Sequence, residues 1–172
     1  MNKLGIDGAL LTHVLLTPIL LFPVALLLPA GLVAAWRRRR EPAIRFAICW
    51  LVPAWIVFEL TPTKLVHYTL PMYGALALLM AAALTAPLGR AVRWTGAILG
   101  LLSAAPVAAV AIYGQVMFGS GASLWWTIAT VVGAALAAAV GGLMLVRQSG
   151  VVAILWAMAF GIAAHAGLSG TV

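Results

Sequence analysis

The chain has 172 residues, of which 65% are hydrophobic and only 8% are charged, and its mean hydropathy is +1.16. This composition excludes a soluble globular domain of such length and indicates an integral membrane protein. The net charge of +7 comes mainly from arginines that lie in clusters between apolar runs, which excludes the basic face of a nucleic-acid-binding protein. The single cysteine, Cys49, excludes a disulfide framework and a Cys/His metal site.

The first predicted membrane span covers residues 15–36 approximately and contains Pro18, Pro23 and Pro29. A proline inside a helix removes a backbone hydrogen bond, so we expect this span to be kinked or to begin irregularly. Prolines are tolerated in a span where neighbouring helices satisfy the freed carbonyl groups. The three prolines therefore predict a bundle of helices rather than a lone membrane anchor.

The strongest charge run follows this span and consists of Arg37, Arg38, Arg39 and Arg40. Arginines directly beside an apolar span are typical of a cytoplasmic turn that faces anionic lipid headgroups. We therefore assign these four residues a structural role in membrane topology, with no part in binding a substrate.

The second predicted span covers residues 44–60 approximately and ends near Glu59. An acidic side chain at the end of a span is costly unless it is paired or hydrated. We therefore expect Glu59 to have a structural role with a cationic partner, and Lys64 is the candidate.

Most of the reactive side chains of the chain gather between this span and the next. Thr61 followed by Pro62 is typical of an N-cap with proline at the first helical position, which predicts a helix from Thr61. Lys64, His67 and Tyr68 would then share one face of that helix. A helix N-terminus beside an ammonium group favours phosphate, although the same three residues are also typical of interfacial anchors.

Four more apolar runs follow, at about 68–86, 94–114, 125–146 and 151–168. Gly96 and Gly100 in the second of these runs have the GxxxG spacing that allows close contact between helices. All the runs together predict an all-α, polytopic integral membrane bundle of about six transmembrane helices. We expect residues 1–172 to form a single membrane domain.

The basic residues divide the predicted connections between two sides of the membrane. The turns at 37–45, 87–93 and 147–150 carry five, two and one arginine, and the opposite side has only Lys3 and Lys64. The positive-inside rule places the arginine turns in the cytoplasm, so both termini are expected to face outward. Glu59 and Lys64 would then face the outer side of a bacterial inner membrane.

The ordered segment Trp50-Leu-Val-Pro53, Phe58-Glu59 and Lys64-Leu-Val-His-Tyr68-Thr-Leu-Pro71 resembles a signature of the family 39 polyprenyl-phosphate-sugar glycosyltransferases. This group includes the protein O-mannosyltransferases and the lipid A aminoarabinose transferase. The resemblance covers residues 20–86 approximately. It implies that a sugar is transferred, with inversion, from a polyprenyl-phosphate lipid on the outer face of the membrane. It also implies that Lys64 and Tyr68 lie near the lipid phosphate, with His67 in a supporting role.

The chain departs from this family in one respect. The family's catalytic aspartate lies in a first outward loop, before the part that matches here, and neither Asp7 nor Glu59 is assigned its role. We therefore predict no catalytic residue, and expect the carboxy-terminal portion of a longer enzyme that is inactive without a separate amino-terminal half. No resident cofactor is predicted, and a metal requirement stays open. A non-catalytic membrane scaffold and a small six-span transporter remain the alternatives.

Overall fold

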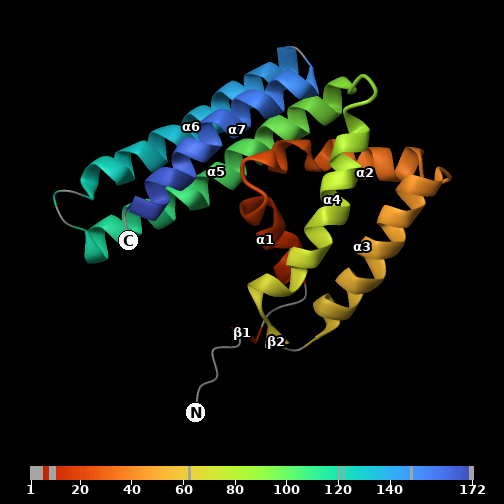
Figure 1. Ribbon diagram of the computed structural model, residues 1–172, viewed down its shortest axis with the longest axis horizontal. Coiled ribbons are helices and arrows are strands. Elements are labelled where there is room, and N and C mark those ends of the chain that lie inside the picture. The colour runs from red at the N-terminus through yellow and green to blue at the C-terminus, as the bar shows by residue number, and fades with distance from the viewer. Residues whose placement is uncertain are drawn as a thin grey trace. The chain divides into compact units, whose positions relative to one another are not determined.

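A computed structural model describes residues 6–7, 11–61, 63–119, 121, 123–147 and 149–170 (Figure 1). The described part is helical except for one short pair of antiparallel strands. Its elements in chain order are β1 (Ile6–Asp7), α1 (Thr12–Leu20), η1 (Val24–Leu27), α2 (Leu28–Arg37), α3 (Pro42–Leu60), β2 (Thr63–Lys64), η2 (Val66–Thr69), α4 (Leu70–Ala83), α5 (Arg90–Phe118), α6 (Leu124–Arg147) and α7 (Gly150–Gly170).

Four of the described helices, α3, α5, α6 and α7, are long and apolar enough to cross a membrane. A fifth span results if α1 and the η1–α2 segment are taken as one broken span. The predicted all-α polytopic membrane bundle is thus confirmed. The expected span at 68–86 corresponds to η2 and α4, and the 14 residues of α4 extend only about 21 Å, short of a hydrocarbon layer of about 30 Å.

The first expected span is broken, as its prolines predicted. The helix α1 ends at Leu20, and after the turn at 21–23 the chain continues in η1 and α2, bent by 115° from its first direction. Pro18 lies inside α1, and Pro23 lies in the turn itself. Bends of this size in helical segments are ordinarily caused by proline, because the residue has no N–H for the helical hydrogen bond.

The chain divides into two compact units. The first is formed by described residues up to 17 and by 30–86, and the second by 18–29 and 87–170. In the first unit α3 packs along α4, and β1 pairs with β2 so that Ile6 lies opposite Lys64 and Asp7 opposite Thr63. The expectation of one membrane domain concerns the arrangement of the two units and stays a prediction.

In the second unit α5, α6 and α7 lie side by side, and η1 packs on α5 (Figure 1). A Cβ atom added to Gly96 would overlap the carbonyl oxygen of Leu26 in η1, and one added to Gly100 would lie 3.3 Å from the Leu26 Cβ. The close contact predicted from the Gly96–Gly100 spacing is therefore confirmed, with η1 as the neighbour. The core beside it consists largely of alanine: Phe22, Ala104, Ala134, Ala137, Ala138 and Ala164.

In the first unit, Arg38 connects the turn after α2 to the end of α4. Its Nη1 donates hydrogen bonds to the Ala82 carbonyl at 2.7 Å and to the Thr85 hydroxyl at 3.0 Å. Its Nε and Nη2 bind the two carboxylate oxygens of Glu41, each at 2.8 Å. The hydrogen bond from Arg38 lowers the pKa of Glu41, and the same bond raises the pKa of Arg38.

The other three arginines of this turn are exposed. The guanidinium of Arg39 lies over the Trp36 ring, 4.8 Å from its centroid, and its Nη1 donates to the Trp36 carbonyl at 2.8 Å. Arg37 and Arg40 make no hydrogen bond with the residues that the structure describes. The run from Arg37 to Arg40 thus includes one arginine that holds the fold together, and its role in membrane topology stays a prediction.

Candidate functional site

The segment between α3 and α4 does not form the helix that we predicted from Thr61. The helix α3 ends at Leu60, and Thr61 follows it in an extended conformation, with φ −66° and ψ 130°. A residue before proline is biased to this conformation because the proline ring clashes with a helical backbone. Thr61 therefore terminates one helix instead of capping the next, and the prediction was wrong.

The next α-helix, α4, begins at Leu70, where Pro71 occupies the first turn. The N-terminal proline signal is real, but it acts at Pro71. Before it, Lys64 lies in β2, while His67 and Tyr68 lie in η2. The three residues consequently do not share one face of a helix, because the backbone at 63–64 pairs with β1, far away in the sequence.

Tyr68 is the best-defined of the three predicted site residues. Its half-buried ring lies 5.3 Å from the Phe58 ring at the end of α3, measured between centroids. The ring of His67 meets it edge-on at 5.1 Å, and His67 is exposed. The side chain of Lys64 lies outside the described part of the structure, so its placement stays a prediction.

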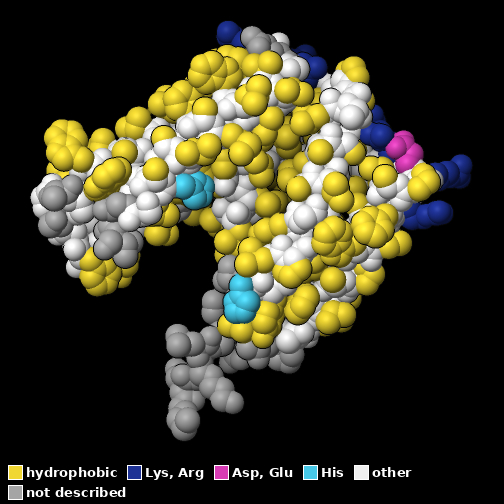
Figure 2. All heavy atoms as spheres, in the orientation of Figure 1, with side chains coloured by type: hydrophobic (Ala, Val, Ile, Leu, Met, Phe, Trp, Pro, Cys, Tyr) yellow, Lys and Arg dark blue, Asp and Glu magenta, His cyan; other side chains and the backbone are white. Residues whose placement is uncertain are grey.

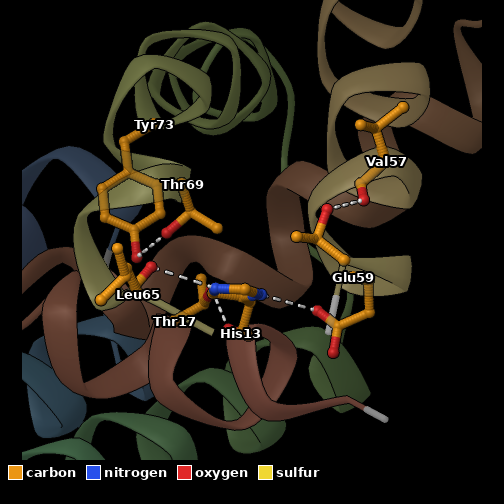
Figure 3. Close-up of polar contacts among 8 residues, drawn as sticks. His13, Thr17, Val57, Glu59, Leu65, Thr69 and Tyr73 are labelled. Carbon is orange, nitrogen blue, oxygen red and sulfur yellow. Dashed lines mark hydrogen bonds and ion pairs between the residues drawn. The ribbon is translucent and has the colours of Figure 1, made fainter. Parts of the chain in front are cut away.

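A polar cluster that sequence reasoning missed lies directly beside this segment (Figure 3). Glu59 is buried, with 8% of its surface exposed, and its Oε2 lies 3.2 Å from Nδ1 of His13. His13 comes from α1, and its side chain is only 1% exposed. The structure thus gives Glu59 a hydrogen-bonding partner, His13, from α1. The predicted contact with Lys64 involves a side chain outside the described part, so it stays a prediction.

His13 also contacts the chain just after Lys64. Its Nε2 lies 3.2 Å from the carbonyl oxygen of Leu65, and Figure 3 shows the ring between Leu65 on one side and Glu59 on the other. The hydroxyl of Thr17 donates to the His13 carbonyl at 2.6 Å, one turn along α1. The imidazole therefore joins three parts of this unit: α1, the end of α3 and the connection from β2 to η2.

The geometry of His13 defines how many protons the cluster holds. A neutral imidazole has one N–H, whereas both ring nitrogens here face oxygen acceptors. Both hydrogen bonds form if an imidazolium faces the Glu59 carboxylate, or if a protonated Glu59 donates to Nδ1 of a neutral ring. In both arrangements the pair has no net charge, and this lowers the desolvation cost of burying it.

Metal ligation receives no support from the described residues. They contain no group of three or more His, Cys, Asp or Glu side chains that could hold a metal ion. His13 and Glu59 form a pair, and the described ends of α1 and α3 add no third ligand to it. The described pair itself forms hydrogen bonds, and the metal requirement stays open.

Part of the chain is similar to curated bacterial transferases. The undecaprenyl phosphate-alpha-4-amino-4-deoxy-L-arabinose arabinosyl transferase 2 of Proteus mirabilis is 45% identical over 56 residues, which cover 32% of this chain and 10% of the relative. Transferase 1 of Pseudomonas fluorescens is 49% identical over 55 residues, with the same two shares. The transferase of Pseudomonas savastanoi pv. phaseolicola is 41% identical over 88 residues, covering 45% of this chain and 16% of the relative.

The chain thus spans only about a tenth to a sixth of the length of these relatives. No family model matches it, and no solved structure matches it. The similarity supports the resemblance to the polyprenyl-phosphate-sugar glycosyltransferases. The protein is therefore a multi-pass membrane protein, and about a third of its chain is similar to bacterial arabinosyl transferases.

Proposed function

We propose that this chain is part of a membrane glycosyltransferase that takes a sugar from a polyprenyl-phosphate donor on the outer face of a bacterial inner membrane. The observation that carries the proposal is the 45–49% identity to aminoarabinose transferases over about a third of the chain. The names of these relatives include undecaprenyl phosphate, which is a polyprenyl phosphate and agrees with the donor class proposed here. The helices long enough to cross a membrane supply the required environment.

In this proposal Lys64 and Tyr68 bind the lipid-linked phosphate, and His67 supports them. An ammonium group and a phenolic O–H near the phosphate offset the negative charge that develops as the sugar leaves. The contact with Phe58 supports the assignment of Tyr68, because it restricts the ring to one region at the end of α3. Exposure of His67 agrees with a secondary role at the edge of the site.

His13 and Glu59 are positioning residues in the same proposal. They do not need to contact the donor, because the hydrogen bond from His13 to the Leu65 carbonyl acts on the residue next to Lys64. Glu59 holds the other side of the imidazole and thereby ties Leu65 to the end of α3. A phosphate site benefits from such support, since misplacement of a binding group by about 1 Å removes much of its effect.

No residue of this chain is assigned as the catalytic base. In this proposal the chain contributes to binding the donor. The arginine turns face the cytoplasm and both termini face outward. Reporter fusions test this orientation, because moving Arg37–Arg40 into the connection between α5 and α6 would then disturb insertion; normal insertion would contradict it.

Binding of polyprenyl phosphate to the purified protein tests the proposal. Replacing Lys64 with alanine is expected to weaken binding by about 1.5–3 kcal/mol, because a charge-assisted contact is lost. Arg40→Ala is the matched control, since it removes one positive charge from an exposed side chain in the arginine turn. Equal binding by wild type and Lys64→Ala would show that Lys64 does not contact the phosphate. Equal losses of affinity in Lys64→Ala and Arg40→Ala would show that Lys64 acts only through the net charge of the protein.

A further inference from the structure

The three arginines of the second unit have no acidic partner within it. They are Arg90, Arg93 and Arg147, and residues 87–172 contain neither aspartate nor glutamate. Arg90 and Arg147 are exposed and make no hydrogen bond or ion pair with the residues that the structure describes. Among the three acidic residues of the chain, Glu41 belongs to the same predicted side of the membrane, and Arg38 already binds both of its oxygens. Arg90, Arg93 and Arg147 are therefore available to an anion from outside this unit.

Arg93 links the start of α5 to the end of α6. Its Nε donates to the Leu88 carbonyl at 2.9 Å, and its Nη1 lies 3.5 Å from the Val146 carbonyl. These contacts hold the guanidinium in place and leave its remaining N–H groups without a partner among the described residues. Figure 2 shows dark-blue basic side chains at this end of the unit, near the connection from α6 to α7, with no magenta acidic side chain beside them on the face shown.

A cleft of about 430 Å³ lies at this end of the second unit, and its lining consists of Leu88, Arg90, Arg93, Trp94 and Val146. Because α5 begins at Arg90, the unpaired N–H groups of its first turn lie at the same end of the helix. Two guanidinium groups and a helix N-terminus together are suited to a phosphate. The charge of this cleft is therefore suited to an anion.

A second cleft, of about 420 Å³, adjoins the first and follows the seam between α5 and α6. The two clefts share Trp94 and Val146, and Arg147 lies at the rim of the second. Its walls are apolar and mostly small, and include Ala97, Leu101, Ala138, Ala139, Gly142 and Leu143. These small residues leave a furrow on the surface between the two helices.

We propose that the two clefts form a binding site for an anionic phospholipid. The phosphate headgroup binds Arg90, Arg93 and Arg147, and one acyl chain lies along the furrow between α5 and α6. Basic pockets between transmembrane helices on the cytoplasmic side are typical sites for anionic headgroups. The exposed ring of Trp94 lies between the two clefts, as expected for tryptophan at the boundary between headgroups and acyl chains.

The apolar furrow distinguishes a lipid from a soluble phosphate. A free phosphate would use only the arginine-lined cleft and would leave about 420 Å³ of adjoining apolar space unused. The site also uses other residues than the one proposed around Lys64, because the lining of both clefts belongs to the second unit and Lys64 lies in β2 of the first. The inference does not depend on the transferase activity.

Binding of phosphatidylglycerol to the purified protein in detergent, followed by native mass spectrometry, tests the headgroup. Phosphatidylcholine with the same acyl chains is the zwitterionic reference. Arg90→Gln and Arg147→Gln are each expected to weaken phosphatidylglycerol binding about fivefold, with the fold intact because neither side chain makes a hydrogen bond with the described residues. Arg40→Gln, which changes an exposed arginine of the first unit, is the control and is expected to leave binding unchanged.

A pair of alanines on α6 tests the acyl-chain furrow. Ala139 lines the furrow, whereas Ala135 is equally exposed one turn earlier and does not line it. Ala139→Trp is expected to block phosphatidylglycerol binding, and Ala135→Trp to leave it unchanged. Equal binding of the two lipids, equal losses in Arg40→Gln and Arg90→Gln, or normal lipid binding by Ala139→Trp would each overturn the proposal. Full competition by inorganic phosphate with no effect of Ala139→Trp would show a simple anion site instead.

Discussion

The two compact units join their helices by different physical means. In the first unit α1, the end of α3 and the β2–η2 connection meet around a buried pair, His13 and Glu59, and a hydrogen bond to Leu65. In the second unit α5, α6 and α7 meet through glycine and alanine, and the residues 87–172 contain no carboxylate side chain. Polar contacts thus contribute to the unit that contains Lys64 and Tyr68, and close packing of small residues dominates in the other.

The membrane explains why both means are needed. Lipid chains are as apolar as leucine, so burying apolar surface gives little drive for helices to associate. What remains is dispersion between closely packed backbones, which small residues permit, and hydrogen bonds between polar side chains. The second unit relies mainly on the first of these, with the hydrogen bond from Thr127 in α6 to Gln115 in α5 as an addition, and the cluster around His13 relies on the second. The two units should therefore respond differently to substitution.

The largest expected effect concerns the buried pair. Glu59→Leu or His13→Leu should each lower the free energy of unfolding by about 3–5 kcal/mol, because each removes the hydrogen bond between the two buried side chains. The double variant should lose much less than the sum, since neither buried polar side chain then remains without the other and only the bond to the Leu65 carbonyl is still lost. Unfolding in detergent, followed by tryptophan fluorescence, measures both. His67→Ala changes an exposed histidine of the same unit and is the control, so it should change stability little. Additive losses in the double variant would refute the coupling between His13 and Glu59.

A smaller effect is expected from the packing of the second unit. Gly96→Ala should lower the free energy of unfolding by about 1–3 kcal/mol, because the new methyl group overlaps the Leu26 carbonyl oxygen. Gly114→Ala is the matched control: it lies in the same helix, and nothing stands within 4 Å of its added Cβ. Alanine favours a helix over glycine by about 1 kcal/mol, so this variant should be unchanged or slightly more stable. If the two variants behave alike, close packing at Gly96 does not hold this unit together.

The same contrast separates what could be predicted from the sequence and what could not. The helices α5, α6 and α7 match the predicted spans to within four residues at each end, because apolar length and the intervening glycine, proline and serine residues are local signals. The break after Leu20 was predicted from its prolines for the same reason. In these regions the residues adjacent in the sequence determine the backbone conformation.

The first unit depends on contacts between residues that lie far apart in the chain. His13 and Glu59 are 46 positions apart, and the β1–β2 pair joins residues 6–7 to 63–64. The pairing at 63–64 is what displaced the helix start from Thr61 to Leu70. One signal could have found the buried pair: an ionisable side chain in an apolar run is costly alone, and His13 and Glu59 are two such residues with complementary charge.

The smallest expected effect concerns the exposed pair of the arginine turn, which contrasts with the buried pair of the same unit. Arg38 lowers the pKa of Glu41, so the stabilising contribution of Glu41 is complete above its ordinary value of about 4.3 and is lost as the pH falls through the lower value of the folded state. At neutral pH Glu41→Gln should lower the melting temperature by only about one or two degrees, because solvent screens an exposed pair.

The difference in melting temperature between Glu41→Gln and wild type should shrink as the pH is lowered toward 3, and thermal melting in detergent measures it. Arg40→Gln should show no such pH dependence, since Arg40 has no partner among the described residues. A difference between Glu41→Gln and wild type that persists at the lowest pH would mean that Glu41 acts by packing and not by charge.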